Sequence, residues 1–359
     1  MHITISDFPA KGSVLTGREI VELARAAEEA GMDRFAVTDF PFYRDCVPLM
    51  TACLEGTTRL AVESLVTNPF LRMPDVTACT WATMAELSGG RAILGIGKGG
   101  GVPPIFVAPW GYERPNPRVA VAELIAICRA MWAGEVPLAV GRAIGTSGLR
   151  LDFPLEHRVP ILVAARGPKM LGVAARHADI VHVSSPFLAG RYVDGLLAVV
   201  DAAAADAGRS AADFEVDLTV SLCALDDAGQ AQRLGRITTA SAIVWLSKDA
   251  DHAALDGAVP GELVTRLTAG WDMWSGEPLP DDLAAAIDDE VMREFTVAGD
   301  VAACREALGE LIARFPRVTG LRLKLPSVTG PDSYRLLREM IENAGEVVAG
   351  AVAPARPGR

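Results

Sequence analysis

The sequence is poor in positive charge and has no long apolar run. Its 359 residues include 34 Lys and Arg against 45 Asp and Glu, a formal net charge of −11, and the basic residues form no cluster along the chain. Such an acidic chain repels nucleic-acid phosphates and anionic membranes, so neither is an expected partner. No apolar run reaches the ~18 residues of a membrane span, and the first residues lack the basic start and apolar core of a signal peptide. We therefore expect a cytoplasmic, globular protein of enzyme size.

Cysteine and histidine are scarce and scattered. The six cysteines include no C-x-x-C pair, and the five histidines do not stand at metal-ligand spacing. Reduced, buried thiols and structural histidines are the expectation, with no metal site. The acidic clusters at 281–282 and 288–290 bracket one amphipathic helix, and helix-end or solvated charge explains them better than a metal site does.

What the sequence does contain is a regular alternation of short β-branched or apolar runs with longer, Ala-rich helical patterns. That alternation is typical of parallel strands joined by helical crossovers. Eight strands are expected, at residues 2–5, 34–38, 59–66, 91–96, 160–165, 179–183, 214–224 and 319–325. Eight such units close into a (β/α)8 TIM barrel, in which the site lies on the loops after the carboxyl ends of the strands.

The barrel accounts for residues 1–347 as one domain with two insertions. The first, at about 134–159, precedes the fifth strand, and the second, at about 248–290, lies near the seventh strand and before the seventh barrel helix at 300–314. Segments of this length usually cover or shape a site, although packing decoration and subunit contacts are alternatives. The last residues, 348–359, are expected to be disordered.

A glycine-rich loop at residues 95–101 follows the fourth strand and formally satisfies G-x-G-x-x-G. A dinucleotide-binding turn opens directly into a helix, whereas Pro103, Pro104 and Pro109 prevent a helix here for about fifteen residues. We interpret the loop as flexible backbone at the catalytic face, with Lys98 and Gly99 facing a ligand. A tight structural turn is the alternative.

Four further segments carry a family likeness. They are AELSGGRAILGIG at 85–97, VTNPFLRMP at 66–74, VAARGPKML at 163–171 with Ala178-Asp179 after it, and VTD at 37–39. In this order they resemble the bacterial luciferase-like family of flavin- and deazaflavin-dependent oxidoreductases. The likeness is greatest to the methylenetetrahydromethanopterin reductase branch and to other branches that use the deazaflavin coenzyme F420. It runs in register to about residue 190 and is looser until the final strand and helix.

The resemblance implies a site for the cofactor phosphate after the fifth strand. Arg166, Gly167 and Pro168 begin a helix whose free N–H groups can hold a phosphate, and Lys169 adds positive charge. In the family a hydroxyl after the sixth strand is a further ligand, and Ser184 occupies that place here. The implied cofactor is F420, with FMN as the alternative.

The resemblance also implies a non-prolyl cis peptide bond that makes a bulge against the cofactor ring at the end of the third strand. Ser64, Leu65 and Val66 stand at this point, so the bond is expected at 64–65 or 65–66. Asp39 closes the second strand and is implied to lie at the catalytic rim with Phe40, beside the cofactor.

Two positions depart from the family pattern. Phe40 stands where deazaflavin-dependent relatives have the His of an Asp-His pair, and Gly100 stands where relatives often have a carboxylate. Both familiar acid/base positions are therefore empty. Tyr43 is the candidate proton donor and Arg44 the candidate ligand of an anionic substrate, with ordinary packing or solvation as the alternative for each.

Together these observations favour an F420-dependent reductase that transfers hydride from C5 of the deazaflavin to a C=C, C=N or C=O bond of a small-molecule or peptide-like substrate. An FMN-dependent monooxygenase and a noncatalytic flavin- or deazaflavin-binding protein are the alternatives. The sequence does not identify the substrate. Relatives are commonly homodimers, and the flat, Ala-rich helices are suited to the same assembly.

Overall fold

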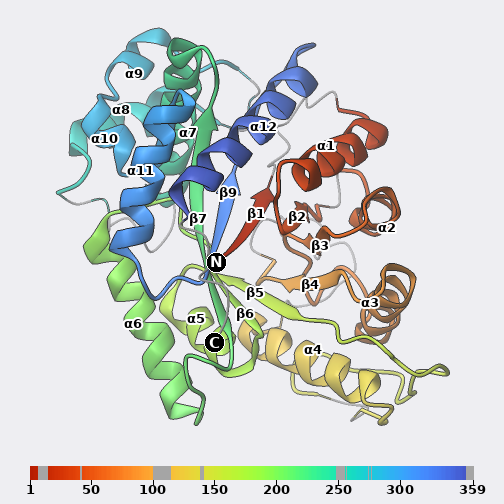
Figure 1. Ribbon diagram of the computed structural model, residues 1–359. Helices are drawn as coiled ribbons and strands as arrows, with labels where there is room; N and C mark the ends of the chain where they lie inside the picture. The colour runs from red at the N-terminus through yellow and green to blue at the C-terminus, as the bar shows by residue number, and fades with distance from the viewer. Residues whose placement is uncertain are drawn as a thin grey trace, which may run out of the picture.

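The computed structural model describes residues 1–6, 15–40, 43–99, 115–137, 141–247, 255, 257–273, 275 and 277–352. Eight parallel strands among them form a closed barrel surrounded by helices (Figure 1). The barrel strands are β1 (His2–Ser6), β2 (Arg34–Val37), β3 (Ala61–Ser64), β4 (Ala92–Ile96), β5 (Ile161–Ala165), β6 (Ile180–Val183), β7 (Glu215–Ala224) and β9 (Gly320–Lys324). They coincide with the eight predicted strands to within two residues at each end, so the predicted (β/α)8 fold is confirmed.

The sheet closes into a barrel because β9 pairs with both β1 and β7, and β7 also pairs with β6. Strand β1 pairs in parallel with β2 on one side and with β9 on the other. Strand β7 pairs with β6 through Glu215–Leu218 and with β9 through Asp217–Ser221. All strands run in the same direction, so their carboxyl ends meet at one face of the molecule.

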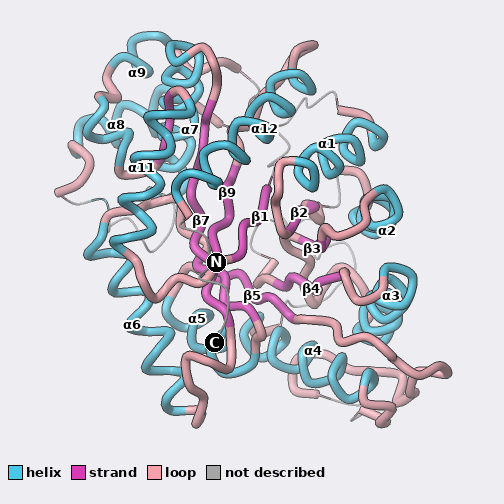
Figure 2. Tube along the Cα trace, viewed as in Figure 1, coloured by secondary structure: helices cyan, strands magenta, loops and turns pink. Residues whose placement is uncertain are grey.

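Helices cover the outside of the barrel (Figure 2). They are α1 (Gly17–Glu29), α2 (Cys46–Gly56), α3 (Pro74–Ser88), α4 (Pro117–Trp132), α5 (Pro168–His177), α6 (Gly190–Asp206), α11 (Val301–Arg314) and α12 (Ser333–Ala351). Their starts follow local chemistry: Thr16 and Glu19 form a capping box at α1, and Asp300 caps α11 by accepting from the Ala303 N–H at 2.8 Å. Helix α12 continues past its predicted end at residue 347, and residues 353–359 of the predicted tail lie outside the described residues.

The second insertion adds a helical subdomain at one side of the barrel (Figure 1). Its helices are α8 (Gly261–Gly270), α9 (Asp281–Ala285) and α10 (Asp289–Arg293), and with α7 (Ala228–Ser247), the helix before it, they enclose an apolar core of their own. A short strand that the sequence did not predict, β8 (Thr296–Gly299), follows the insertion. Ser221 pairs with Lys324 of β9 and with Thr296 of β8, so β8 occupies the edge of β7 that β6 has left.

The first insertion is anchored to α3 and α4. The Glu123 carboxylate accepts from the N–H groups of Arg142, Ala143 and Ile144 at 2.6, 2.9 and 3.0 Å. The Asp75 carboxylate accepts from the Ser147 N–H at 2.8 Å. The described part of this segment has neither helix nor strand, and charge-assisted hydrogen bonds to its backbone give it a fixed course.

Two kinds of side chain fill the inside of the barrel. A small apolar cluster comes from the three strands β4, β5 and β6; its members are Ile93, Leu162 and Ile180. A charged group comes from β3, β7 and β9; its members are Glu63, Asp217 and Arg322, which are at most 1% exposed. Barrel interiors are normally filled by branched apolar residues, so the charged group is unusual.

Candidate active site

The sequence motifs that suggested a site lie at the carboxyl-end face of the barrel. Asp39 and Phe40 follow β2, Leu65 and Val66 follow β3, Lys98 and Gly99 follow β4, Arg166 and Gly167 follow β5, and Ser184 follows β6. Because the strands are parallel, five loops that are distant in sequence reach one rim. The structure therefore brings the predicted cofactor residues to the same face, while their contacts with a ligand stay predictions.

The end of β3 carries the expected backbone feature. The bond between Leu65 and Val66 is a non-prolyl cis peptide, at the second of the two predicted positions. The chain is tied to both neighbouring strands here, since the Leu65 N–H donates to the Val37 carbonyl at 2.8 Å and the Thr67 N–H donates to the Gly95 carbonyl at 2.9 Å. The Leu65–Val66 segment is thereby fixed at the rim between β2 and β4.

The first glycines of the loop after β4 are explained by this bulge. A Cβ on Gly95 would lie 1.8 Å from the Ser64 carbonyl oxygen, and one on Gly97 would lie 2.5 Å from Val66 Cγ2. At Gly95 only glycine permits so close an approach of two backbones, and at Gly97 a Cβ would displace the Val66 side chain. The Ser64 hydroxyl accepts from the Gly95 N–H at 3.0 Å and donates to its carbonyl at 2.8 Å, and the residue is fully buried. Ser64, predicted to contact the cofactor, therefore has its side chain turned to β4 and supports the rim.

An ion pair that the sequence analysis missed holds Asp39. Arg72 Nη1 lies 2.5 Å from Asp39 Oδ2, and Arg72 Nη2 lies 3.3 Å from Asp39 Oδ1, so the pair is bidentate. Arg72 also donates to Thr67 Oγ1 at 3.1 Å and to Asp45 Oδ1 at 3.2 Å. Burial opposes the charge of Arg72, but hydrogen bonding and attraction by Asp39 raise its pKa. Arg72 joins the loops after β2 and β3 and neutralises Asp39.

The residue that replaces the family's histidine packs against the candidate acid. The rings of Phe40 and Tyr43 lie 5.9 Å apart in an edge-on arrangement with an interplanar angle of 69°. The Tyr43 N–H also donates to the Phe40 carbonyl at 3.0 Å. Phe40 and Tyr43 are thus neighbours in space as well as in sequence. Arg44, the next residue, is exposed.

The start of α5 forms an open cradle. Gly167 is its N-cap with φ −84° and ψ 150°, Pro168 is the first helical residue, and no side chain caps this end among the described residues. A Cβ built on Gly167 meets no described atom within 4 Å. Ser184 lies next to it, because its N–H donates to the Ala165 carbonyl at 2.8 Å. The cradle fits a phosphate, which binds to first-turn N–H groups and is attracted by the helix dipole.

A tryptophan from α7, the helix before the second insertion, reaches this cradle. The guanidinium carbon of Arg166 lies 4.5 Å from the centroid of the Trp245 ring, a cation–π contact. Trp245 belongs to α7 and is 40% exposed. Nothing in the sequence signalled this contact, because it depends on how α7 folds back onto the barrel. Trp245 holds the cation beside the phosphate cradle and gives the site an aromatic wall.

Other predictions about this face have mixed outcomes. Lys98 is exposed, and Gly99 has a positive φ of 69°, a backbone conformation that favours glycine. Gly100, with its missing carboxylate, and the prolines after it lie outside the described residues.

The sequence predicts buried cysteines. Burial raises the pKa of the Cys53 thiol to about 12, as expected for an inert cysteine, but Cys79 on α3 is exposed.

The described residues include neither a cluster of metal ligands nor a membrane-spanning helix. No group of three His, Cys, Asp or Glu side chains there could hold a metal ion. No helix there has both the length and the hydropathy to cross a membrane.

Comparison with known proteins supports one family. The sequence matches the family model described as luciferase-like monooxygenase over residues 2–316. It is 29% identical over 300 residues to a 5,10-methylenetetrahydromethanopterin reductase of Methanolobus tindarius, covering 82% of this chain and 86% of the relative. It is 32% identical over 217 residues to an F420-dependent glucose-6-phosphate dehydrogenase of Rhodococcus erythropolis, covering 57% of this chain and 64% of the relative.

Solved structures share the fold. A coenzyme F420-dependent tetrahydromethanopterin reductase of Methanopyrus kandleri has a TM-score of 0.74 at 21% identity, covering 95% of this chain and 97% of that one. The oxygenating constituent of 3,6-diketocamphane monooxygenase of Pseudomonas putida, in complex with FMN, has a TM-score of 0.68 at 15% identity, covering 98% and 99%. The names of the two sequence relatives support an oxidoreductase. The structural neighbours include an F420-dependent reductase and an FMN-containing monooxygenase.

Proposed function

Because the chain belongs to the luciferase-like monooxygenase family, we propose that it is an F420-dependent oxidoreductase that reduces an unsaturated small molecule. When bound, reduced F420 supplies a hydride at C5, which the C=C, C=N or C=O bond of the substrate accepts. The observation that carries the proposal is the open cradle at Gly167, where a helix start, a fixed cation and a neighbouring serine lie together at the catalytic face. The cofactor is assigned as F420 because of the motif likeness and the names of the sequence relatives.

The protein's own residues would bind and orient the cofactor in three ways. Gly167 and the first turn of α5 would hold the phosphate, with Ser184 as a further hydroxyl ligand. Arg166, Lys169 and Lys98 would attract the acidic tail, which needs local cations in a chain of net charge −11. The Leu65–Val66 bulge would lie against the ring.

The substrate side of the site would be drier than in relatives that have a histidine. Phe40 can neither donate nor accept a proton, so it would exclude water from the reacting atoms. Tyr43, packed on Phe40, is the candidate proton donor, and exposed Arg44 is the candidate ligand of an anionic substrate. Asp39 is paired with Arg72 and would act as a fixed hydrogen-bond acceptor at the rim.

An FMN-dependent monooxygenase is the second candidate, favoured by the FMN-containing structural neighbour, and a noncatalytic binding protein is the third. One experiment separates the three. The purified protein is titrated with F420 and FMN, and the bound, reduced cofactor is offered first an unsaturated acceptor and then O2. Reoxidation of the cofactor by the acceptor supports the reductase. Rapid reoxidation by O2 with oxygenation of the acceptor supports the monooxygenase. Cofactor binding without reoxidation by the acceptor or by O2 supports the noncatalytic binding protein.

A further inference from the structure

The inward-facing residues of β7 form a polar column through the barrel. Glu215, Asp217, Thr219 and Ser221 alternate with residues of the main apolar core, such as Val216 and Leu218. Successive side chains on a strand point to opposite faces, so the four polar residues share the inner face. We call them the β7 polar file. An apolar strand would be expected at this place in a barrel.

Carboxylates outnumber arginines around the β7 polar file. Arg322 binds Glu63 from β3, and its Nη2 lies 3.3 Å from Asp217 Oδ2. Arg34 from β2 lies 2.6 Å from Glu215 Oε2 and 3.6 Å from Asp217 Oδ2. Three carboxylates thus share two guanidinium groups, which leaves one negative charge that a proton can neutralise. Burial raises the pKa of Asp217 to about 6. The positive charges of Arg322 and Arg34 act against this rise, and the negative charges of Glu63 and Glu215 add to it.

Several buried polar atoms along the β7 polar file have no hydrogen-bond partner among the described residues. They include Asp217 Oδ1, Ser221 Oγ, Glu63 Oε2 and His182 Nδ1. Buried polar groups are nearly always satisfied, and bound water is the usual partner where no protein group is in reach. Alternate side chains on a strand leave the backbone about 6.6 Å apart, and one water joins two polar atoms that lie up to about 5–6 Å apart, so each bridge needs side chains that lean toward each other or more than one water. The geometry therefore suits a row of waters.

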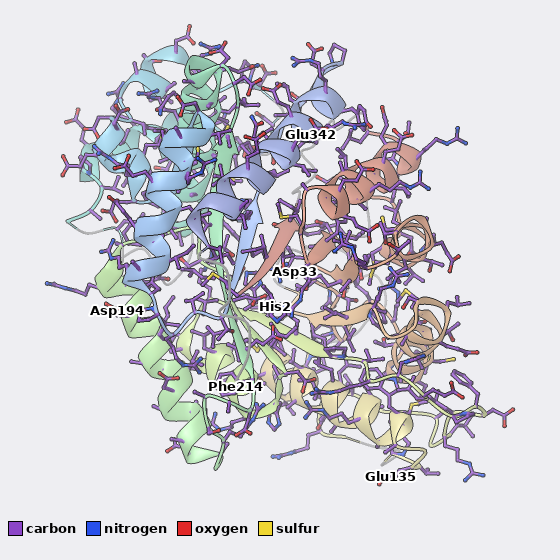
Figure 3. All side chains as sticks on the ribbon, viewed as in Figure 1. His2, Asp33, Glu135, Asp194, Phe214 and Glu342 are labelled. Carbon is purple, nitrogen blue, oxygen red and sulfur yellow. The ribbon has the colours of Figure 1, made fainter. Side chains whose placement is uncertain are left out.

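The β7 polar file reaches both ends of the barrel. Glu215 is one-third exposed at the end where the strands begin, and its carboxylate lies 3.6 Å from Nε2 of His2, which Figure 3 labels near the start of β1. At the other end Ser221 pairs with Lys324 at the carboxyl end of β9. Beside the file, His182 Nε2 lies 2.7 Å from Thr219 Oγ1, and Ser184 of the cofactor cradle is two residues further on from His182.

His182 is suited to pass a proton along this route. Burial, reinforced by the charge of Arg322, lowers its pKa well below the usual value, so its ring is neutral. A neutral imidazole donates at one nitrogen and accepts at the other. With Nε2 at Thr219 and Nδ1 available to water, it joins the file to the rim.

We propose that the β7 polar file, bridged by water, conducts protons from the start of the barrel to the catalytic face, with Asp217 as its buried acid. The inference rests on the proposed reductase and supplies the proton for which Phe40 and Gly100 offer no donor. Hydride adds to one atom of the substrate double bond, and the other atom takes a proton passed along the file from the Asp217 carboxyl. Asp217 then regains a proton from solvent through Glu215. Tyr43 would be either the last donor of this route or dispensable.

The route is tested first by kinetics with matched buried threonines. Thr219→Val breaks the file, whereas Thr239→Val removes a buried α7 hydroxyl that is bonded to Thr296 of β8. Oxidation of reduced F420 by menadione, a quinone with conjugated C=C and C=O bonds, is followed in H2O and D2O. Thr219→Val should slow it at least about tenfold with a larger D2O effect, since a positioned acid contributes ~10²–10⁴. Equal rates and D2O effects in wild type and both variants would overturn the proposal.

Two measurements on the protein without cofactor or substrate need no turnover. They therefore test the β7 polar file even if the reductase assignment is wrong. A high-resolution crystal structure should show water at hydrogen-bonding distance from Asp217 Oδ1 and Ser221 Oγ, and a dry barrel would overturn the proposal. Infrared titration should show a protonated carboxyl that appears as the pH falls through about 6 and is absent in Asp217→Asn. A carboxyl that stays ionised down to pH ~4, the ordinary range for Asp, would contradict the proposal as well.

Discussion

Gly167 allows the proposed phosphate site to be tested by a pair of substitutions. Its φ of −84° lies near the value that proline requires, so Gly167→Pro removes the N–H donor with little distortion. Gly167→Ala keeps the donor, and its Cβ meets no described atom within 4 Å. Loss of one hydrogen bond to a charged group costs ~1.5–3 kcal/mol, so the proline variant should bind F420 about ten- to hundredfold more weakly. The alanine variant should bind almost as wild type, and equal affinities in both would place the phosphate elsewhere.

The hydroxyl of Tyr43 can be removed without loss of its ring packing. Tyr43→Phe keeps the edge-on contact with Phe40, whose ring centroid is 5.9 Å away. If Tyr43 is the proton donor, turnover should fall by ~10²–10⁴ while cofactor affinity stays nearly constant. Steady-state rates and F420 titrations on the same preparation check this. Full activity in the variant would eliminate Tyr43 as donor and leave the β7 polar file as the supply.

Single residues show which parts of the site the sequence could predict. The cradle residues from Arg166 to Lys169 stand in one contiguous motif, and a helix start after a strand explains their chemistry. Arg72 also lies within a recognised motif, yet its role depends on a bidentate contact with Asp39, 33 positions earlier. The alternation of polar and apolar residues from Glu215 to Leu222 was visible in the sequence. The sequence alone does not show which side of this strand faces the inside of the barrel. The fold shows that it is the polar side.

At the scale of elements, local pattern predicted the strands and helices of the barrel but not the short strand β8. Four residues, Thr296–Gly299, carry too little periodicity to be recognised. Their pairing depends on β7 extending to Ala224, beyond its contact with β6. In the second insertion the sequence predicted one amphipathic helix between the acidic clusters, where the structure has the two short helices α9 and α10, and it did not predict α8.

Helix α7, which leads into this insertion, contributes a side chain to the site. Trp245→Leu would remove the aromatic face under Arg166 and with it the cation–π contact. A partly exposed cation–π contact is worth ~0.5–1 kcal/mol, so F420 affinity should fall about two- to fivefold. Trp245→Phe, which keeps an aromatic face, should lose less. Fluorescence titration of the three proteins measures the effect, and an unchanged affinity in Trp245→Leu would show that the contact does not position Arg166.

At the scale of the whole molecule, the expected homodimer has a candidate surface on α3. Met73, Val76 and Leu87 are 61, 51 and 60% exposed, and Cys79 lies exposed between them. Apolar side chains gathered on one helix face are typical of protein interfaces. We expect wild type to be dimeric in light scattering at micromolar concentration and Leu87→Arg to be monomeric with an unchanged circular dichroism spectrum. A monomeric wild type would remove the dimer, and a dimeric Leu87→Arg would move the interface elsewhere.

The assignment of the whole chain as a deazaflavin-dependent reductase depends on which cofactor the barrel accepts and what reoxidises it. Equilibrium titration with F420 and FMN, followed by anaerobic mixing of the reduced complex with an unsaturated acceptor, measures both. The account predicts tighter binding of F420, weakened in Gly167→Pro, and hydride transfer to the acceptor without O2. Tighter binding of FMN with O2-dependent reoxidation, or no binding of F420, would contradict it.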